Sequence, residues 1–409
     1  MATTSEQQPE INRQIDILSR GIVEIIPAEG LREKITHSLC TGRPLKVKLG
    51  LDPTAPDVHL GHTVVLRKLR QFQGLGHEVQ LVIGDFTGRI GDPSGRSDAR
   101  KQLTDAEVTA NAKTYVEQFG KVMDSSKIKV HFNSEWLNKL NFSDVVRLSS
   151  QITVARMLER DDFEKRYKAN LPISVHEFFY PLMQGYDSIT LDTDIELGGT
   201  DQKFNLLMGR QLQEAYGQEK QIIMTSPLLE GLDGERKMSK SLGNCIGINE
   251  TPNSIYGKTM SIPDHLMLRY FMLVTDVTNE TLQEMEAGLK ENTLHPRDLK
   301  MRLSRTIVTM YHGEQAGQVA EQHFVTVFQE RALPEDINEA QWKGKASVGV
   351  VKLLSELGLT ASNSEARRMI QSGAVRVNGE RMVTDEQVVN VESGTIVQVG
   401  KRKIVRVRV

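Results

Sequence analysis

The residues best suited to chemistry in this chain are two histidines, His59 and His62, which lie three positions apart. Side chains at this spacing project to the same side of a helix. Gly61 between them lets a ligand lie close against the backbone, and Thr54 lies in the turn before them. Because amide groups at a helix start are unpaired and attract phosphate, the stretch favours a nucleotide site. The alternatives are a metal pair or a capped surface helix, and the spacing identifies no third zinc ligand.

Lys237 and Lys240 form a second pair with the same spacing, about 180 residues further along the chain. They lie in a stretch of small residues between Gly234 and Gly243. A charge cluster of this kind is usually a solvated surface. Lysine is also a long, flexible point charge, so in combination with the histidine stretch this pair favours a mobile clamp on phosphate groups.

The elements that must position these residues follow from periodicity. Residues 46–51 predict a strand, residues 59–62 the start of a helix that continues through 64–75, and residues 79–84 a second strand. This β-α-β alternation predicts a parallel sheet with helices on its faces. Ligands of such sheets bind at the carboxyl ends of the strands, which is where His59 and Gly84 fall.

Composition limits the classes of protein that this chain can be. At 409 residues it is long enough for two or three domains, and a formal net charge of −2 excludes a uniformly basic nucleic-acid coat. With only Cys40 and Cys245, neither a disulfide framework nor a cysteine zinc site is expected. The sequence has no apolar run of membrane-spanning length and no signal-peptide core in its first residues. We therefore expect a reduced, cytoplasmic protein without membrane partners.

Composition and the distribution of charge along the chain also predict domain boundaries. Residues 347–409 contain ten Lys or Arg and six Asp or Glu, a net +4, so the rest of the chain carries −6. Any nucleic-acid surface should therefore be local. We expect a catalytic α/β domain at 1–225 that includes a helical insertion at about 104–185, a lysine-rich loop and helical domain at 226–330, a linker at 331–346, and a small basic domain at 347–409.

In this order the histidine and lysine stretches resemble the HIGH and KMSKS motifs of class I aminoacyl-tRNA synthetases. Three further motifs are similar to those of the bacterial tyrosyl-tRNA synthetase family: GDPSG from Gly91, Tyr-x3-Gln-x2-Asp from Tyr180 and GGxDQ from Gly198. The resemblance covers nearly the whole chain. It implies an enzyme with a Rossmann-like parallel sheet and a helical insertion, followed by a helical domain and a small α+β RNA-binding domain.

The resemblance also implies the reaction and the residues that carry it. L-tyrosine would be activated with ATP, brought in with Mg²⁺, and then transferred to the 3′ end of tRNA(Tyr). Because the tyrosine carboxylate attacks the α-phosphorus directly, catalysis would be positioning and electrostatics. The implied catalytic residues are Thr54, His59, His62, Arg96, Arg100, Lys237 and Lys240. The implied ATP-binding residues are Gly50, Asp52, Gly61, Gly199, Asp201 and Met238.

Tyrosine recognition is implied at a further set of residues, Asp92, Tyr180, Gln184, Asp187 and Gln202. Without the resemblance, Tyr180, Gln184 and Asp187 would read as the polar face of an amphipathic helix. Asp187 would accept from the phenolic hydroxyl, while Asp92, Tyr180 and Gln184 would hold the amino group. Many family members have a tyrosine at the position of Lys48, and strand alternation puts Lys48 on the same side as Gly50. Lys48 either shares in recognising the hydroxyl or holds Asp187 ionised.

The basic carboxyl-terminal segment resembles the RNA-binding domain shared with a ribosomal small-subunit protein. Arg367 and Arg368 are expected on a helix, and residues 375–377 on the following strand before an Asn-Gly turn. The implied tRNA-binding residues are Arg367, Arg368, Arg376, Lys401 and Arg402. A basic solvated cap is the alternative reading.

Family membership further implies a homodimer that pairs through the insertion, and no tightly bound, protein-ligated metal. Two rivals remain for the whole chain. One is a tryptophan-specific relative, which the Tyr-x3-Gln-x2-Asp and GGxDQ matches disfavour. The other is an RNA-binding scaffold derived from a synthetase, which is expected to have lost phosphate-handling residues.

Overall fold

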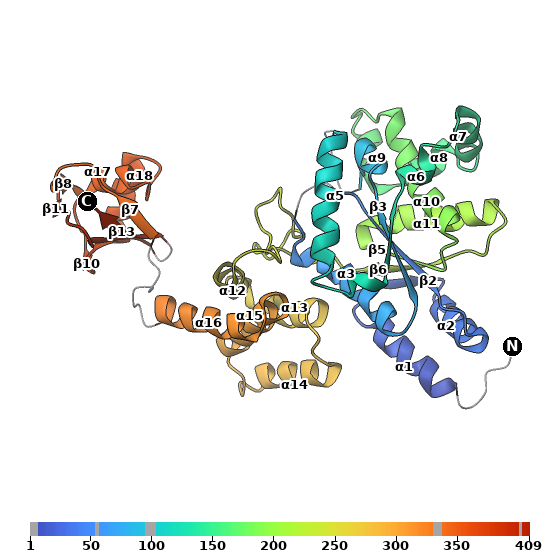
Figure 1. The fold of residues 1–409 in the computed structure, drawn as a ribbon, viewed down its shortest axis with the longest axis horizontal. Helices are drawn as coiled ribbons and strands as arrows, with labels where there is room; N and C mark the ends of the chain where they lie inside the picture. Colours follow the sequence, from blue (N-terminus) through green and yellow to red (C-terminus); the bar gives the residue numbers. More distant parts are fainter. Residues whose placement is uncertain (1–6, 54–56, 95–103, 330–337, 401–402) are drawn as a thin grey trace. The chain divides into compact units, whose positions relative to one another are not determined.

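The computed structural model describes residues 7–53, 57–94, 104–329, 338–400 and 403–409. The chain divides into two compact units, Met1–Gly317 and Gln318–Val409 (Figure 1). In the segments given above, no helix is long and apolar enough to cross a membrane. Thr54, Arg96, Arg100, Lys401 and Arg402 lie outside the described residues.

The first unit is built on a six-stranded sheet in the order β1-β6-β5-β2-β3-β4. All neighbours are parallel except β1, which runs antiparallel to β6. The strands are β1 (Glu24–Ile26), β2 (Lys46–Leu51), β3 (Glu78–Ile83), β4 (Ile128–Phe132), β5 (Ile195–Gly199) and β6 (Ile222–Ser226). The predicted α/β class with a parallel sheet is confirmed.

The order of the strands creates a point of reversal at β2. From β2 the chain continues outward to β3 and β4 on one side, and β5 and β6 lie on the other. In sheets of this kind the loops diverge at the carboxyl ends of the two strands that flank the reversal, and ligands bind there. The histidine stretch follows β2, and the GGxDQ loop follows β5. The topology therefore brings these two motifs to one edge of the sheet.

Helices cover the sheet and extend beyond it. The helix after β2 begins where sequence predicted, because His59 has an extended backbone and caps α3 while Leu66, Leu69 and Phe72 bury its apolar side. The helices of the first unit and of the segment that follows it are α1 (Gln8–Ser19), α2 (Gly30–Thr41), α3 (Leu60–Gly74), α4 (Thr87–Ile90), α5 (Asp105–Phe119), α6 (Ser134–Leu137), α7 (Phe142–Ser149), α8 (Val154–Met157), α9 (Asp161–Lys168), α10 (Phe179–Leu191), α11 (Lys203–Ala215), α12 (Pro252–Met260), α13 (Met267–Val274), α14 (Asn279–Lys290), α15 (Pro296–His312) and α16 (Glu314–Phe324).

The structure places a strand within the predicted helical insertion at about 104–185. Residues 128–132 within it form β4, an edge strand of the main sheet, rather than a helix. The strand was missed because only partly buried apolar residues alternate with Lys129 and His131, which gives a weak signal. The helices α6 to α9 lie after this strand, between residues 134 and 168.

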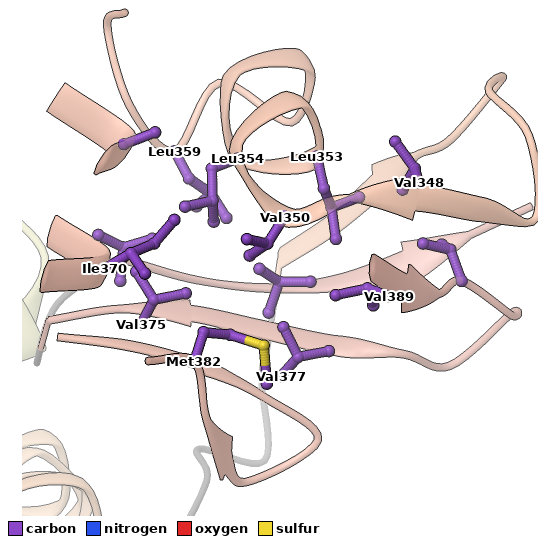
Figure 2. Close-up of a cluster of buried hydrophobic side chains, with 14 of the residues drawn as sticks. Val348, Val350, Leu353, Leu354, Leu359, Ile370, Val375, Val377, Met382 and Val389 are labelled. Carbon is purple, nitrogen blue, oxygen red and sulfur yellow. The ribbon is translucent and has the colours of Figure 1, made fainter. Parts of the chain in front are cut away.

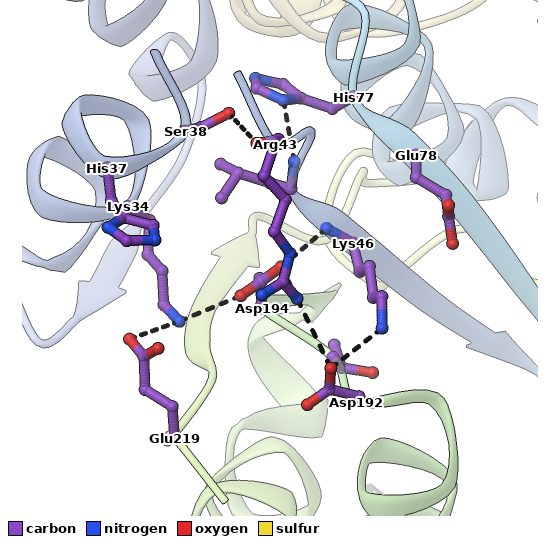
Figure 3. Close-up of polar contacts among 12 residues, drawn as sticks. Lys34, His37, Ser38, Arg43, Lys46, His77, Glu78, Asp192, Asp194 and Glu219 are labelled. Carbon is purple, nitrogen blue, oxygen red and sulfur yellow. Dashed lines mark hydrogen bonds and ion pairs between the residues drawn. The ribbon is translucent and has the colours of Figure 1, made fainter. Parts of the chain in front are cut away.

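A polar network fixes the amino-terminal end of the sheet, opposite the carboxyl edge (Figure 3). The carboxylate of Asp194 accepts from the backbone amide of Lys46 at 3.0 Å and from Nζ of Lys34 at 3.1 Å. Asp192, which ends α10 in a left-handed conformation, accepts from Nζ of Lys46 at 2.9 Å. These bonds tie β2, β5 and α2 together, so the register of the two central strands is set at the end far from the predicted site.

The two central strands also share a buried ion pair. Nζ of Lys48 on β2 lies 2.9 Å from Oε1 of Glu196 on β5, and both side chains are 0% exposed. The ammonium group also donates to Oγ of Ser188 at 2.7 Å and to the carbonyl of Gln184 at 3.2 Å. Oε2 of Glu196 accepts in turn from Nε2 of Gln221. A buried charge is tolerated only when it is paired and hydrogen-bonded, and this network satisfies all three donors of the lysine.

The second unit is a small α+β module. Its five-stranded sheet has the order β10-β9-β12-β13-β7, beside a two-stranded sheet β11-β8. The elements are β7 (Asn338–Gln341), β8 (Ser347–Gly349), α17 (Val350–Glu356), α18 (Asn363–Gln371), β9 (Val375–Val377), β10 (Glu380–Arg381), β11 (Val388–Asn390), β12 (Ile396–Val399) and β13 (Lys403–Arg408). Aliphatic side chains from both layers fill its core (Figure 2).

The structure refines the predicted linker at 331–346. Residues 338–341 form β7, which pairs in parallel with β13 and completes the five-stranded sheet. The strand was hidden because its residues are mostly polar and exposed, as an edge strand allows. Two predictions in this unit are confirmed, since Arg367 and Arg368 lie on α18, and β9 ends at a turn formed by Asn378 and Gly379 with positive φ angles.

We predict that Lys48→Met lowers the free energy of unfolding by about 3–5 kcal/mol, because it leaves Glu196 as an uncompensated buried charge. The double variant Lys48→Met/Glu196→Gln should lose less than the two single variants combined. Denaturant unfolding curves measure both. Lys46→Met is the control on the same strand, since its pair with Asp192 is partly exposed and should contribute less than about 1 kcal/mol. Equal losses at the two positions would contradict the importance of the buried pair.

Candidate active site

A cleft of about 980 Å³ opens at the carboxyl edge of the main sheet. It gathers every catalytic, ATP-binding and tyrosine-binding residue predicted from sequence that the structure describes. These lining residues are Gly50, Asp52, His59, Gly61, His62, Asp92, Tyr180, Gln184, Asp187, Gly199, Asp201, Gln202, Lys237, Met238 and Lys240. Positions from Gly50 to Lys240 thus converge on one cavity.

Backbone hydrogen bonds hold the histidine stretch beside the segment that follows the lysine loop. The amide of Leu60 donates to the carbonyl of Ile246 at 2.9 Å, and the amide of Ile248 donates to the carbonyl of Val58 at 3.1 Å. His59 and Gly247 between them form an antiparallel bridge. The main chain of the histidine stretch is therefore bonded to residues 246–248, which closely follow the lysine loop.

His59 and His62 lie against one another at the start of α3. Their rings stack with centroids 3.9 Å apart, and the amide of His59 donates to Nδ1 of His62 at 3.3 Å. Burial, with the charge of Lys240 adding to it, lowers the pKa of His62 to about 4, and burial likewise lowers the pKa of His59. Both imidazoles are therefore neutral at pH 7 and act as hydrogen-bonding groups. A Cβ at Gly61 would lie 3.0 Å from the His59 ring, so only glycine leaves that ring its place.

Both lysines of the loop are paired with carboxylates at the cleft wall. Nζ of Lys237 lies 3.0 Å from Oδ2 of Asp201, and Nζ of Lys240 forms an ion pair with Asp57. Both pairs are partly exposed, so each is weak and can exchange for a stronger anion. The arrangement supplies two mobile positive charges beside the start of α3, which suits a polyphosphate.

A second group of polar side chains, around Asp52, also lines the cleft. Oδ1 of Asp52 accepts from Oγ1 of Thr87 at 2.8 Å, and Oδ2 accepts from the hydroxyl of Tyr180 at 2.9 Å. A Cβ at Gly84 would meet Oδ1 of Asp52 at 2.0 Å, which explains the glycine at the end of β3. The loops after β2 and β3 thus hold Tyr180 of α10 in place.

Asp187 is the buried carboxylate of the cleft, 3% exposed. Its Oδ1 accepts from Nε1 of Trp136 at 2.8 Å, and its Oδ2 lies 3.5 Å from Nδ2 of Asn133. Burial raises the pKa of Asp187 to about 7, against the opposing effects of Lys48, Trp136 and Asn133. The cleft therefore contains a buried carboxyl group that can form a hydrogen bond with a hydroxyl. Sequence reasoning missed Asn133 and Trp136, although Asn133 directly follows β4 at the carboxyl edge.

Lys48 does not line the cleft, because its ammonium group is engaged by Glu196 and Ser188 behind α10. Of the two roles left open for it, direct contact with a ligand hydroxyl is therefore disfavoured. Its charge nevertheless favours the ionised form of Asp187. Nε2 of Gln184 donates to Oε1 of Glu196 at 3.1 Å, so the amide oxygen of Gln184 is the atom left for a cation in the cleft.

Asp92 and Gln202 are hydrogen-bonded to one another where both line the cleft. Nε2 of Gln202 donates to Oδ2 of Asp92 at 2.6 Å, and Ser94 donates to Oδ1 through its amide and its hydroxyl. Burial raises the pKa of Asp92, but Arg160 and these hydrogen bonds more than offset it, so the pKa stays below its ordinary value. Asp92 is therefore a fixed anion suited to an ammonium group.

The arginines predicted for nucleic acid lie on the surface of the second unit. Arg367 and Arg368 of α18 and Arg376 of β9 are exposed. Arg367 forms an exposed ion pair with Asp385 at 3.2 Å, and Nη1 of Arg376 donates to the carbonyl of Gly379 at 3.0 Å. These weak contacts leave the guanidinium groups accessible to phosphates.

The sequence matches two family models. Residues 41–329 match tRNA synthetases class I (W and Y), and residues 330–406 match the tyrosine–tRNA ligase SYY-like C-terminal domain. The chain is 59% identical over 399 residues to the tyrosine–tRNA ligase of Moorella thermoacetica, which covers 98% of this chain and 96% of that protein. It is 50% identical over 394 residues to the tyrosine–tRNA ligase of Thermotoga maritima, with 96% and 97% covered.

Solved structures share the fold of the first unit. A C-terminally truncated mitochondrial tyrosyl-tRNA synthetase of Aspergillus nidulans matches with a TM-score of 0.64 and 22% identity, covering 79% of this chain and 97% of that one. The tyrosyl-tRNA synthetase of Archaeoglobus fulgidus, complexed with L-tyrosine, matches with a TM-score of 0.61 and 22% identity, covering 76% and 99%.

Proposed function

The chain belongs to the class I tRNA synthetases (W and Y), and within them to the tyrosine–tRNA ligases, and from that membership we propose roles for the residues of its cleft. It activates L-tyrosine with ATP to tyrosyl-adenylate and transfers the tyrosyl group to the 3′ end of tRNA(Tyr). The observation that carries the assignment of the site is the convergence of the histidine stretch, the lysine loop and the buried Asp187 on one cleft. We place the enzyme in the cytoplasm, where translation consumes its product.

We propose that the cleft accelerates adenylation by positioning and charge. The tyrosine carboxylate attacks the α-phosphorus of ATP and pyrophosphate leaves, so no protein nucleophile is needed. His59 and His62 as neutral donors, together with Lys237 and Lys240, stabilise the charge that develops on the phosphate oxygens. Gly50, Gly61, Gly199 and Met238 shape the nucleotide wall, and Asp52 and Asp201 are available to ribose hydroxyls. We assign Thr54, Arg96 and Arg100 to the phosphates on the family resemblance alone.

The same cleft holds tyrosine at both ends. Asp92, Tyr180 and the amide oxygen of Gln184 receive the ammonium group, and Gln202 contacts the reacting carboxylate. Asp187 accepts from the phenolic hydroxyl. Trp136 and Asn133 hold the carboxyl group of Asp187 in place, and phenylalanine has no hydroxyl to donate to it. This polar pocket also disfavours the tryptophan-specific alternative.

ATP enters with magnesium bound to its phosphate oxygens, because Mg²⁺ prefers phosphates and water to an all-protein cage. When bound, it neutralises part of the triphosphate charge. Asp57, which Lys240 releases as it turns to phosphate, is the cleft carboxylate that fits a hydrated cation. In the part of the chain that the structure describes, no cluster of three His, Cys, Asp or Glu forms a metal site.

We propose that the second unit holds tRNA(Tyr) through its backbone. The exposed arginines Arg367, Arg368 and Arg376 supply phosphate contacts, with Lys401 and Arg402 added on the resemblance. Because such contacts release counterions, this part of the affinity falls steeply with salt. An RNA-binding scaffold without activity is the alternative, but the described phosphate-handling residues are all in place.

We propose a homodimer that pairs through the helices before α10. Several of their large apolar side chains are exposed: Phe142, Val146, Val154, Tyr167, Leu171 and Val175. Phe142 and Val146 lie four residues apart on α7 and so face the same side of that helix, and exposed apolar side chains gathered on one surface mark an interface. Figure 1 shows α7 and α8 at the far side of the first unit from α12 to α15.

His59→Ala and Lys240→Ala should each lower the rate of tyrosyl-adenylate formation by about 3 kcal/mol of transition-state stabilisation, roughly 100-fold, with tyrosine affinity little changed. Groups used in the transition state affect the rate more than ground-state binding. Single-turnover adenylation and equilibrium tyrosine binding measure the two quantities. Lys258→Ala, which removes a lysine outside the cleft, is the control. Near-normal adenylation in either cleft variant would show that the motif assignment is wrong.

Asp187→Ala should erode the preference for tyrosine over phenylalanine. Losing the partner of the phenol removes about 1–3 kcal/mol of discrimination, roughly 5- to 150-fold in the ratio of kcat/KM for the two amino acids. Tyr186→Phe is the control, since it removes a hydroxyl from the same helix at a side chain that does not line the cleft. An unchanged ratio in Asp187→Ala would reject Asp187 as the reader of the hydroxyl.

Arg367→Ala/Arg368→Ala should weaken tRNA binding and reduce the slope of log affinity against log salt by about 1 per arginine. Tyrosine-dependent pyrophosphate exchange should be unchanged, because the cleft is made by the other unit. Filter binding at several salt concentrations and exchange assays test both statements. Lys290→Ala, an exposed lysine of α14, is the matched control. Parallel loss of exchange and tRNA binding would contradict a separate RNA-binding role.

Phe142→Asp/Val146→Asp should convert the dimer to a monomer, because two carboxylates cannot be buried unpaired in an apolar interface. Sedimentation equilibrium measures the mass directly. Val388→Asp, an exposed valine of the second unit, is the control and should stay dimeric. A wild-type protein that sediments as a monomer would rule out the proposed assembly.

A further inference from the structure

We propose that Arg160 is a positioning residue for amino-acid activation, which holds Asp92 and Gln202 in the orientation that receives the two charged ends of tyrosine. The inference deepens the proposed function of the cleft and rests on it. Arg160 caps the start of α9, between the helices of the insertion, and does not itself line the cleft. Sequence reasoning did not single it out.

Four side chains form a closed ring of hydrogen bonds. Nη2 of Arg160 donates to Oδ1 of Asp92 at 3.1 Å, and Oδ2 of Asp92 accepts from Nε2 of Gln202 at 2.6 Å. Oε1 of Gln202 accepts from Nδ2 of Asn205 at 2.9 Å, and Oδ1 of Asn205 accepts from Nη1 of Arg160 at 2.9 Å. Each member therefore fixes the rotamer of the next.

Burial makes the guanidinium a rigid part of this ring. The Arg160 side chain is 3% exposed, and its guanidinium carbon lies 5.2 Å from the centroid of the Phe163 ring. Nε donates to Oδ1 of Asp162 at 2.7 Å, which leaves both Nη groups directed at the ring. A guanidinium presents its donors in a fixed fork, whereas a lysine ammonium is a point charge that cannot hold the same three directions.

The ring also decides which way the amide of Gln202 points. Because Asn205 donates to Oε1 of Gln202, the NH₂ group of Gln202 faces Asp92 and the cleft. When a substrate ammonium group takes Oδ2 of Asp92, that NH₂ group is released and becomes a donor for the substrate carboxylate. The opposite amide orientation would present an oxygen to that carboxylate and repel it. Arg160 and Asn205 thus couple recognition of the two ends of the amino acid.

The charge of Arg160 also stabilises the ionised form of its carboxylate partners. Asp92 and Asp162 are the charged groups beside Arg160, so one guanidinium serves two buried carboxylates. Burial alone would favour a protonated Asp92, and Arg160 is the largest effect that opposes it. Without Arg160 the carboxylate would be less ionised and would lose one of the donors that orient it, and affinity for the ammonium group would fall.

The test measures tyrosine-dependent pyrophosphate exchange for Arg160→Lys in the full-length enzyme. We expect the KM for tyrosine to rise at least about 10-fold while the KM for ATP stays within about 2-fold, because the ring touches only the amino-acid end. Arg166→Lys is the matched control. Arg166 is also a buried arginine of α9, and its bidentate pair with Glu177 lies outside the cleft.

Asn205→Asp tests the amide orientation with little change in shape. The aspartate can still accept from Arg160 but cannot donate to Gln202, so kcat/KM for tyrosine should fall at least about 10-fold in a folded protein. This variant decides the matter if Arg160→Lys does not fold. An unchanged KM for tyrosine in Arg160→Lys, an equal rise in Arg166→Lys, or a normal Asn205→Asp would each overturn the inference and leave the proposed function standing. A wild-type enzyme without tyrosine-dependent exchange would overturn both.

Discussion

The buried pair between Lys48 and Glu196 is the interaction on which the rest of the structure depends. It joins the two strands at the reversal of the sheet and reaches α10 through Ser188 and the carbonyl of Gln184. The helix that carries Tyr180, Gln184 and Asp187 is therefore fixed from behind by charge as well as by packing. A pair of this kind adds little net stability, but breaking it is costly, so its value lies in fixing one arrangement.

Inside the cleft, polar side chains form hydrogen bonds and ion pairs with one another in the absence of ligands. Lys237 is paired with Asp201, Gln202 with Asp92, and Tyr180 with Asp52. Ligand binding on this surface is therefore an exchange of partners rather than a simple gain of contacts. A ligand that cannot replace each lost hydrogen bond leaves a desolvated group unpaired, which is how such a site rejects near analogues.

Sequence predicted the parallel sheet, the start of α3 and the convergence of the motifs, because strong local signals coincide there: a buried strand, a helix start and glycines that admit no side chain. It failed where signals are weak or lie far apart. The edge strands β4 and β7 are short and largely polar, so their periodicity is faint. Arg160 and Glu196 act through partners distant in sequence, and no local pattern reveals such a pairing. Sequence also could not predict that Lys48 does not line the cleft, because alternation along β2 shows only which face of the sheet a side chain is on.

The bridge between His59 and Gly247 has a consequence for how the enzyme is made. The two residues of the bridge are separated by most of the first unit, so the bridge closes a long loop. The conformational entropy lost on closing that loop delays formation of the bridge during folding. A chain growing from its amino terminus on the ribosome can assemble β2 and β3 early. The histidine stretch, however, has no backbone partner for its bridge until Ile248 has emerged. A nascent enzyme therefore stays catalytically silent until the segment after the lysine loop has been made.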